Sequence, residues 1–388
     1  MTAIASVEQR TAPPARDRWL LIGVFTALGV GMALWGARIP AVKAAAHISN
    51  GQLSIVLLGA ALGIVIGLQI GGRLAHRYGP SRLLVGPTVG FGLALAVLGQ
   101  CRTLSTLVLA AGLFGLTHGL LDVGSNACAV NVERVYRRRI MASVHCAYSS
   151  GAMVGAALVA VTAWVPHDVA FAIGGGAIAL AALAAVPVVQ ACTCLDAAEQ
   201  ASEPADAPKT TLPRTGVWLL GALAAAVLLG EGAAADWSAV HLRSLGTSEA
   251  TAALAYALYS AAMMTGRLVG DRLTTRFGPM AVVRAGAAIA AAGLGTGLVL
   301  GTPVAALGGW MALGLGLSTA VPCLISAAGR GGPRAVAAVA ATGYVGLLTG
   351  PAAIGALASV TTVSASLALP VVLAAAVALT AHRALESR

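Results

Sequence analysis

A short set of ionisable side chains interrupts the long apolar stretches of this sequence, and these residues are the most able to do chemistry. His118, Asp122 and Asn126 are spaced by four residues, so they share one face of a helix. A buried charge without a partner is costly, so this face must meet water, a proton or another polar group. The pattern predicts a proton-binding carboxylate at Asp122, with an imidazole and an amide beside it.

The next apolar stretch carries two further polar residues, His145 and Tyr148. If the two stretches form antiparallel helices, counting about 1.5 Å per residue from their midpoints places Asp122 level with Tyr148 and Asn126 level with His145. One hypothesis is proton binding at Asp122, tuned by His118 and His145. The alternative is a hydrogen-bonded clamp that holds the two helices together.

Glu231 lies in a run of small residues, between Gly230 and Gly232 and ahead of three alanines. A helix of this composition can approach its neighbours closely or unwind, which would present the carboxylate to a central cavity. The sequence therefore makes Glu231 a candidate for proton or substrate binding. The alternative is an internal hydrogen bond to a neighbouring helix.

The composition defines the elements that must position these residues. Of the 388 residues, 58% are hydrophobic and only 10% are charged, and mean hydropathy is +0.86. Soluble proteins carry about 25% charged residues, so soluble enzymes, disordered chains and disulfide scaffolds are excluded and a membrane protein is expected. With 48 glycines and only 4% aromatic residues, close-packed helices are favoured over a β-barrel with aromatic girdles.

Twelve apolar segments are long enough to cross a hydrocarbon core of about 30 Å, and they predict an all-α membrane protein. We expect an N-terminal bundle over 19–191, a flexible linker over 192–215 and a C-terminal bundle over 216–382, between disordered tails at 1–18 and 383–388. Each bundle has six helices. The predicted segments are 19–39, 51–73, 83–101, 104–131, 140–165, 169–191, 216–240, 249–270, 281–301, 304–327, 335–359 and 363–381.

The positions of Lys and Arg predict the orientation of these segments. Twenty of the 24 Lys and Arg residues fall on the side of the N-terminus, and the four exceptions are Arg38, Lys43, Arg102 and Arg243. Basic residues concentrate in cytoplasmic loops, so both termini are expected in the cytoplasm. The net charge of +10 therefore reflects topology and forms no continuous basic face, and no nucleic-acid partner is expected.

Two charged residues lie near the other side of the membrane. Arg38 ends the first segment and Asp236 lies near the outer end of the seventh, at comparable depth by counting along both helices. We expect an ion pair between them that closes the outer side and breaks when that side opens. The alternative is that Arg38 extends its side chain to the lipid headgroups.

The sequence contains an internal repeat. Residues 71–80, GGRLAHRYGP, match residues 270–279, GDRLTTRFGP, at a constant offset of 199. Both copies lie at the cytoplasmic end of the second segment of their half, so the chain is a tandem duplication of a six-helix unit in parallel orientation. The residues of the two loop signatures are Gly72, Arg73, Arg77, Gly79 and Arg82 in the first copy, and Arg267, Asp271, Arg272, Arg276 and Gly278 in the second.

These loops resemble the signature between the second and third helices of the major facilitator superfamily. The runs at 37–43, 119–134, 231–243 and 343–355 are similar, more narrowly, to its fucose-permease-like branch. The resemblance covers essentially the whole chain. It implies two pseudo-symmetric six-helix bundles that rock about a central substrate site.

The loops depart from the family pattern at one position. The acidic residue that the family carries before the loop arginine is replaced by His76 in the first copy and by Thr275 in the second. In the family this acid tethers the loop to neighbouring helices, and the resemblance implies that Asp271 takes the role in the second half. Drug exporters of the family also carry a Gly-Pro signature on the fifth helix, whereas the fifth segment here has no proline.

The resemblance and the membrane carboxylates together predict a secondary active transporter. We expect it to move a small polar, sugar-like solute by alternating access, coupled to protons through Asp122 or Glu231. An exporter of an amphipathic metabolite or drug by proton antiport is the main alternative, and a passive channel or a sensor is the other. Candidate lining residues of the substrate cavity are Trp35, Asn126, Tyr148, Tyr256, Tyr259, Ser318 and Tyr344.

No enzymatic activity is predicted. A metal bound by His118, His145 and Asp122 would have few ligands from only two helices, and the CxC pair at Cys192 and Cys194 lacks a second pair. No GxxxxGK[ST] nucleotide-binding loop occurs. We therefore expect no metal or cofactor. The expected partners are a small-molecule solute, protons and lipid. We expect a monomer in the bacterial plasma (inner) membrane.

Overall fold

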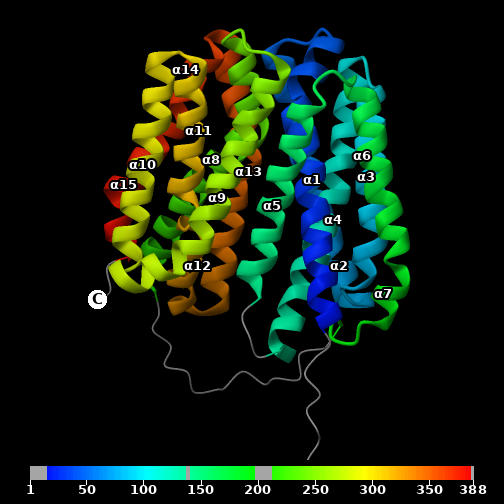
Figure 1. The fold of residues 1–388 in the computed structure, drawn as a ribbon. Coiled ribbons are helices and arrows are strands. Elements are labelled where there is room, and N and C mark those ends of the chain that lie inside the picture. Colours follow the sequence, from blue (N-terminus) through cyan, green and yellow to red (C-terminus); the bar gives the residue numbers. More distant parts are fainter. Residues whose placement is uncertain (1–14, 137–139, 197–211, 386–388) are drawn as a thin grey trace, which may run out of the picture.

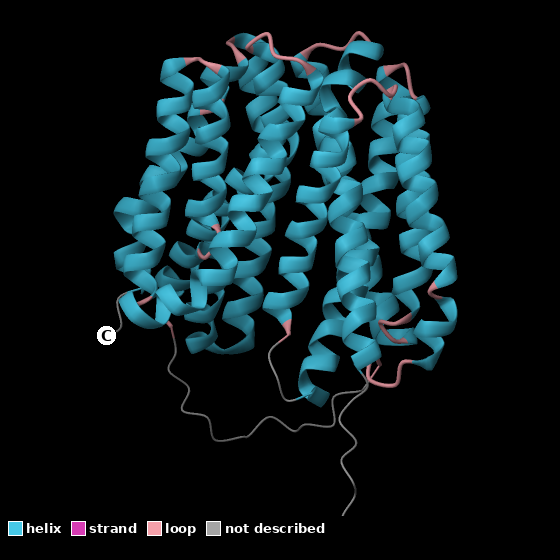
Figure 2. Ribbon diagram, viewed as in Figure 1, coloured by secondary structure: helices cyan, strands magenta, loops and turns pink. Residues whose placement is uncertain are grey.

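The computed structural model describes residues 15–136, 140–196 and 212–385, and within these ranges it consists of helices and short loops without strands (Figure 1, Figure 2). Figure 1 shows the helices of the two halves of the sequence standing side by side as two bundles. We call the end of the bundles at which α1 begins and α15 ends the terminal face, and the other end the opposite face. The predicted all-α fold is confirmed.

Each bundle supplies six spans. The N-terminal bundle contains α1 (Ala15–Ala45), α2 (Asn50–Tyr78), α3 (Arg82–Gln100), α4 (Leu104–Tyr136), α5 (Met141–Val161), α6 (His167–Ala184) and α7 (Val186–Ala191). The C-terminal bundle contains α8 (Arg214–Ser244), α9 (Glu249–Phe277), α10 (Pro279–Leu300), α11 (Pro303–Leu317), α12 (Ala320–Ala328), the 3-10 turn η1 (Gly329–Gly331), α13 (Gly332–Val360), α14 (Val363–Ser366) and α15 (Ala368–Leu385).

Eleven spans of the described chain are long and apolar enough to cross a membrane. The remaining predicted span, the eighth along the chain, is α9, which has 29 residues but carries Glu249, Arg267 and two tyrosines. This helix packs against α5, α8 and α11, so its polar side chains lie among other helices. Its low hydropathy is therefore a consequence of its central position.

Three of the twelve spans are interrupted. The sixth breaks at Ala185 between α6 and α7, the tenth at Ser318 and Thr319 between α11 and α12, and the twelfth at Leu367 between α14 and α15. Proline has no N–H and its ring clashes with the carbonyl four residues earlier, so a helix tends to end just before it. A proline follows each break by a few residues: Pro187, Pro322 and Pro370.

The helix starts repeat between the halves. The hydroxyl of Ser49 accepts a hydrogen bond from the N–H of Gln52 at 3.2 Å, and that of Ser248 accepts one from the N–H of Thr251 at 3.2 Å. Such caps satisfy N–H groups that have no partner within the helix. Thr103 and Thr302 cap the starts of α4 and α11 in the same way. Both pairs are separated by the same 199 residues as the loop signatures.

The packing repeats as well. In the first bundle α1 packs against α5, α2 against α4 and α3 against α6; in the second, α8 packs against α13, α9 against α11 and α10 against α15. Glycines allow the close approaches: a Cβ on Gly115 would collide with the carbonyl oxygen of Ala60. The two bundles meet through α1 with α8, α2 with α13, and α5 with α9.

The boundaries of both tails and of the linker differ from the prediction. Helix α8 begins at Arg214, inside the predicted linker, and α15 continues to Leu385, inside the predicted C-terminal tail. Helix α1 begins at Ala15, inside the predicted tail, and Asp17 is fully buried. The first residues of the predicted linker, 192–196, pack on the N-terminal bundle: the N–H of Cys194 donates to Asp17 at 2.9 Å, and Asn131 donates to the carbonyl of Leu195 at 2.8 Å. The remaining tail and linker residues, 1–14, 197–211 and 386–388, lie outside the described part of the chain.

Candidate functional site

A cavity of about 1390 Å³ lies between the two bundles. Its lining runs from Trp35 and Asp236, within the spans, to Arg330 and Leu385 near the terminal face. The cavity therefore reaches the terminal face. The predicted site residues that line it are Trp35, His118, Asp122, Asn126, His145, Tyr148, Glu231, Asp236, Tyr256, Tyr259, Ser318 and Tyr344.

Toward the opposite face the bundles are in direct contact. Helices α1 and α8 touch at Gly36, where a Cβ would collide with the carbonyl oxygen of Ala235. Beside this contact, the indole Nε1 of Trp237 donates to the carbonyl of Pro351 at 3.0 Å and the side chain is fully buried. The cavity is closed at this end, so the structure represents a state that opens toward the terminal face.

Arg38 connects the two bundles at the closed end of the cavity. Its Nη1 lies 3.2 Å from Oε2 of Glu249 on α9, and its Nη2 donates to the carbonyl of Thr162 at 2.7 Å. The Arg38 side chain is 2% exposed. It therefore joins α1, the end of α5 and the start of α9, and so links the two bundles.

The predicted ion pair between Arg38 and Asp236 is wrong in its partner. Arg38 pairs with Glu249, while Asp236 lines the cavity on the other side of the closure. Counting along a helix gives the depth of a residue but does not give the direction in which its side chain points. The rotation of α8 turns Asp236 toward the cavity, away from Arg38.

Asp122 accepts hydrogen bonds from two neutral donors. Its Oδ1 accepts from Nδ2 of Asn126 at 2.9 Å, and its Oδ2 accepts from the hydroxyl of Tyr344 at 3.2 Å. Tyr344 belongs to α13, so this bond crosses the cavity between the bundles. The alternative hypothesis of a hydrogen-bonded clamp between the fourth and fifth helices is therefore wrong for Asp122. Its partner outside α4 is Tyr344, in the C-terminal bundle.

The two histidines line the cavity but bond to neither Asp122 nor each other in the described structure. The His145 ring packs edge-on against Phe25 with centroids 5.4 Å apart, and the His118 ring lies 6.0 Å from that of Phe91. Nδ1 of His118 is buried without a hydrogen-bond partner. An imidazole in this position can accept a proton or a hydrogen bond when the cavity is filled.

Glu231 and Arg267 form the ion pair of the cavity. Oε2 of Glu231 lies 3.6 Å from Nη2 of Arg267, and the two side chains are 20% and 21% exposed. Nη1 of Arg267 also donates to the hydroxyl of Ser149 on α5 at 2.8 Å. Arg267 therefore holds α8 and α9 of one bundle against α5 of the other.

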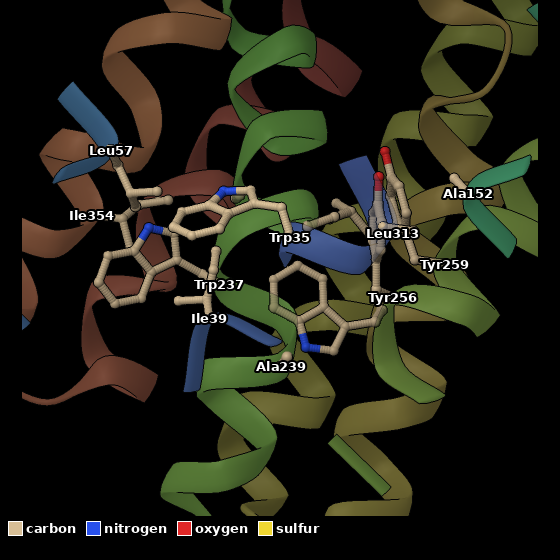
Figure 3. Close-up of a cluster of buried hydrophobic side chains, with 14 of the residues drawn as sticks. Trp35, Ile39, Leu57, Ala152, Trp237, Ala239, Tyr256, Tyr259, Leu313 and Ile354 are labelled. Carbon is tan, nitrogen blue, oxygen red and sulfur yellow. The ribbon is translucent and has the colours of Figure 1, made fainter. Parts of the chain in front are cut away.

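Aromatic side chains occupy the closed end of the cavity. The rings of Tyr256 and Tyr259 are stacked with centroids 6.0 Å apart and an angle of 13° between their planes. Figure 3 shows these two rings side by side on α9, with Trp35 of α1 in the same cluster. The hydroxyls of Tyr148 and Tyr256 lie near each other across the bundle interface. Ser318 lies at the break before α12, where its hydroxyl donates to the carbonyl of Leu315 at 2.7 Å.

Sequence reasoning missed the functional position of two charged residues. Arg267 was assigned to the loop signature, but it lies inside α9 and lines the cavity. Its position within a predicted span was the signal, because an arginine at that depth needs a partner. No feature of the sequence singles out Glu249. It directly follows the capping residue Ser248, and an acid in the first turn of a helix is explained by the helix dipole, so nothing in the sequence indicated a contact with Arg38.

The other signature residues lie near the terminal face, at the ends of α2 and α9 and the start of α3. Gly79 and Gly278 have φ angles of +88° and +80°, in a region that residues with a side chain rarely adopt. Arg77 stacks over Tyr78 at 5.2 Å, and Arg276 over Phe277 at 5.3 Å. The side chain of Asp271 lies outside the described part. The remaining residues are Gly72, Arg73, Arg82 and Arg272.

An acid outside the signature binds the first loop. Oδ1 of Asp196 accepts from the N–H of Ser81 at 2.9 Å, and Oδ2 accepts from the Ser81 hydroxyl. The first loop, which lacks the usual acid at His76, is therefore tethered through the segment that follows α7. No sequence signal linked Asp196 to this loop, because the contact spans 115 residues.

The two cysteines of the CxC pair, Cys192 and Cys194, are expected to be unreactive. Burial and the neighbouring carboxylate of Asp17 raise the pKa of the Cys192 thiol to about 12, and burial raises the pKa of the Cys194 thiol. A thiol that stays protonated at neutral pH is a poor nucleophile and a poor metal ligand. Within the described ranges no group of three His, Cys, Asp or Glu side chains is arranged to hold a metal ion.

The comparisons with known proteins agree with this architecture. The family model described as Major Facilitator Superfamily matches residues 20–333. The chain belongs to this superfamily. An uncharacterized MFS-type transporter of Yersinia pestis is 34% identical over 351 residues, which cover 88% of each chain. The superfamily and this relative are membrane transporters, so the chain is a multi-pass membrane transporter and not an enzyme.

Two solved structures share the superfamily fold. The crystal structure of a D-xylose-proton symporter has a TM-score of 0.73 at 13% identity and covers 96% of this chain and 98% of its own. That of the nucleoside transporter NupG has a TM-score of 0.71 at 11% identity and covers 96% and 100%. At these identities the likeness concerns the arrangement of the twelve spans.

Proposed function

We propose that this protein couples the movement of a small polar organic solute to that of protons by alternating access, with Glu231 as the proton-binding carboxylate. The observation that carries the proposal is the Glu231–Arg267 pair, which lines the cavity and reaches Ser149 of the other bundle. Protonation of Glu231 removes its attraction for Arg267 and so changes a contact that holds the bundles together. Proton binding and bundle movement are thereby linked.

Asp122 has a different role in this proposal. It already accepts hydrogen bonds from Asn126 and Tyr344, two groups that a polyhydroxylated solute can replace. Because the Tyr344 bond crosses the cavity, a solute that bonds to both residues would also bridge the bundles. The two structural neighbours, a D-xylose-proton symporter and a nucleoside transporter, support a polar solute of sugar-like chemistry.

The orientation proposed for the protein places both termini in the cytoplasm. The terminal face carries most of the arginines, which favours the cytoplasmic side. The present state is then inward-facing, with the Arg38–Glu249 pair as the outer gate. We further propose that the protein acts as a monomer in a bacterial plasma membrane.

The test is an internal-pH recording in proteoliposomes under an imposed pH gradient, with a panel of neutral sugars, nucleosides and amines. Wild type should show solute-dependent proton movement, and Glu231→Gln should lose it while retaining solute counterflow. Asp122→Asn serves as the matched carboxylate control and should weaken solute binding instead. Solute flux in wild type without any proton movement would overturn the coupling.

Proton antiport of an amphipathic solute is the second candidate, favoured by the apolar part of the cavity lining. Leu28, Met32 and Leu57 line it together with the aromatic residues. The direction of proton movement separates the two candidates in the same recording: symport carries protons with the solute, and antiport carries them against it.

A further inference from the structure

Asp236 differs from the other acidic residues of the spans. Asp122 accepts two hydrogen bonds, Glu231 pairs with Arg267, and Glu249 pairs with Arg38. For Asp236, the described residues offer neither an ion-pair partner nor a hydrogen-bond donor within reach, and its side chain lines the cavity. A carboxylate in such a place is either protonated or neutralised by a cation that enters the cavity.

The surroundings of Asp236 are aromatic. Helices α1 and α8 touch where Gly36 meets Ala235, and the residues next to these two in sequence, Trp35 and Asp236, both line the cavity. Tyr256 lies near Asp236, and its ring stacks on that of Tyr259. Trp35, Tyr256 and Tyr259 are only 2%, 3% and 5% exposed (Figure 3). A carboxylate beside aromatic rings is an environment that recognises organic cations.

The charge of the cavity supports the same ligand chemistry. Its lining contains three carboxylates, Asp122, Glu231 and Asp236, and two guanidinium groups, Arg267 and Arg330. Arg267 is committed to Glu231, and Arg330 bonds to the carbonyls of Ala327 and Ala384 near the terminal face. Arg38 at the closed end is committed to Glu249 and does not line the cavity, so the lining beside Asp236 has an acid and no base among the described residues.

We propose that the closed end of the cavity is a subsite for a protonated amine on the transported solute, with Asp236 as its receptor. The ammonium group donates hydrogen bonds to the Asp236 carboxylate and lies against the rings of Trp35 and Tyr256. The hydroxyl groups of the same solute reach Asp122 and Asn126. This inference rests on the proposed transport function and narrows its substrate class to polar solutes that carry one amine.

The test compares solutes that differ only by an amine in place of a hydroxyl. Purified full-length protein at pH 7 is titrated with glucosamine against glucose and with 4-aminobutanol against 1,4-butanediol, and binding is followed by tryptophan fluorescence and thermal stability. In wild type the amine of at least one pair should bind about tenfold more tightly or better, as expected for a charge-assisted hydrogen bond. Asp236→Asn should abolish this preference, and Asp236→Glu should retain it.

Asp122→Asn is the matched control, since it removes a carboxylate of the same cavity that is already hydrogen-bonded. It should lower the affinity for both members of a pair and keep the preference for the amine. The inference is overturned if no amine is preferred by wild type, or if the preference survives in Asp236→Asn. An amine preference without proton movement would instead overturn the proposed coupling and leave the subsite standing. Proton-coupled solute flux without any amine preference would overturn the subsite and leave the coupling standing.

Discussion

The loops that follow α2 and α9 have the same backbone but different partners. Gly79 and Gly278 both adopt a positive φ, and both N–H groups bond back to the preceding helix at 3.0 Å. At Gly79 a Cβ would lie 2.8 Å from Asp196, whereas at Gly278 it would meet nothing within 4 Å among the described atoms. The repeated sequence sets the local conformation, and a residue outside the repeat sets the tertiary contact.

The two walls of the cavity show the same asymmetry. The wall of the N-terminal bundle presents Asp122, whose partners are neutral, and the wall of the C-terminal bundle presents Glu231, whose partner is charged. Adding a proton removes the attraction within an ion pair, whereas the neutral donors Asn126 and Tyr344 can still bond to a protonated carboxyl group. The C-terminal wall is therefore suited to sense protons, and the N-terminal wall to bind polar solutes.

The largest expected effect distinguishes the two walls. Glu231→Gln should reduce proton-coupled flux by about 100-fold, because a charge-paired group in a cavity contributes several kcal/mol. Asp122→Asn should reduce it by no more than about tenfold, since an amide still donates and accepts hydrogen bonds. Initial rates in proteoliposomes check this. Equal losses in both variants would contradict the division of roles.

The next effect concerns the closed end. Arg38→Ala removes the contact with Glu249 and the bond to Thr162, whereas Glu249→Gln leaves Arg38 bonded to the end of α5. Arg38→Ala should open the outer side more often than Glu249→Gln does. Labelling of a cysteine introduced at Ala235, by a membrane-impermeant thiol reagent added only from the opposite face, should rise by about tenfold in Arg38→Ala and about threefold in Glu249→Gln, in line with charged hydrogen bonds of about 1.5–3 kcal/mol. Labelling no faster than in the Ala235→Cys parent would exclude a gate here.

A smaller effect separates the two loops. Gly278→Ala should cost about 1–3 kcal/mol, because its φ of 80° with a ψ of 154° lies in a region that essentially only glycine adopts. Gly79→Ala should cost about 1 kcal/mol more, because the added methyl group displaces the carboxylate of Asp196 from Ser81. Thermal unfolding in detergent measures both. Adding Asp196→Ala should remove the difference between the two glycine variants, and persistence of that difference would show that the tether is not its cause.

The smallest effect tests where the halves are alike. Ser49→Ala and Ser248→Ala each remove a helix cap with the same 3.2 Å hydrogen bond. Each should destabilise its bundle by about 1 kcal/mol, as measured for such caps. The control is Ser105→Ala, which leaves the Thr103 cap of α4 in place and should cost less. A clear inequality between the two cap variants would mean that the starts of α2 and α9 are not equivalent.

Local physics made most of the fold predictable. Runs of apolar residues, with prolines and glycines at their ends, determined the twelve spans, and the match between 71–80 and 270–279 determined the two halves. The membrane forces each span to satisfy its own backbone, so length and hydropathy were sufficient. The polar residues of the cavity were found for the same reason, since lipid does not tolerate them.

Partners were decided by the tertiary structure. The sequence placed Asp122, Glu231 and Asp236 in the membrane but could not show that the first bonds to Tyr344, the second to Arg267 and the third to none of the described residues. Depth follows from counting along one helix, whereas a partner depends on the rotation and tilt of two helices. Those are set by close packing over hundreds of residues, as at Gly36 and Ala235, and only the assembled bundles determine them.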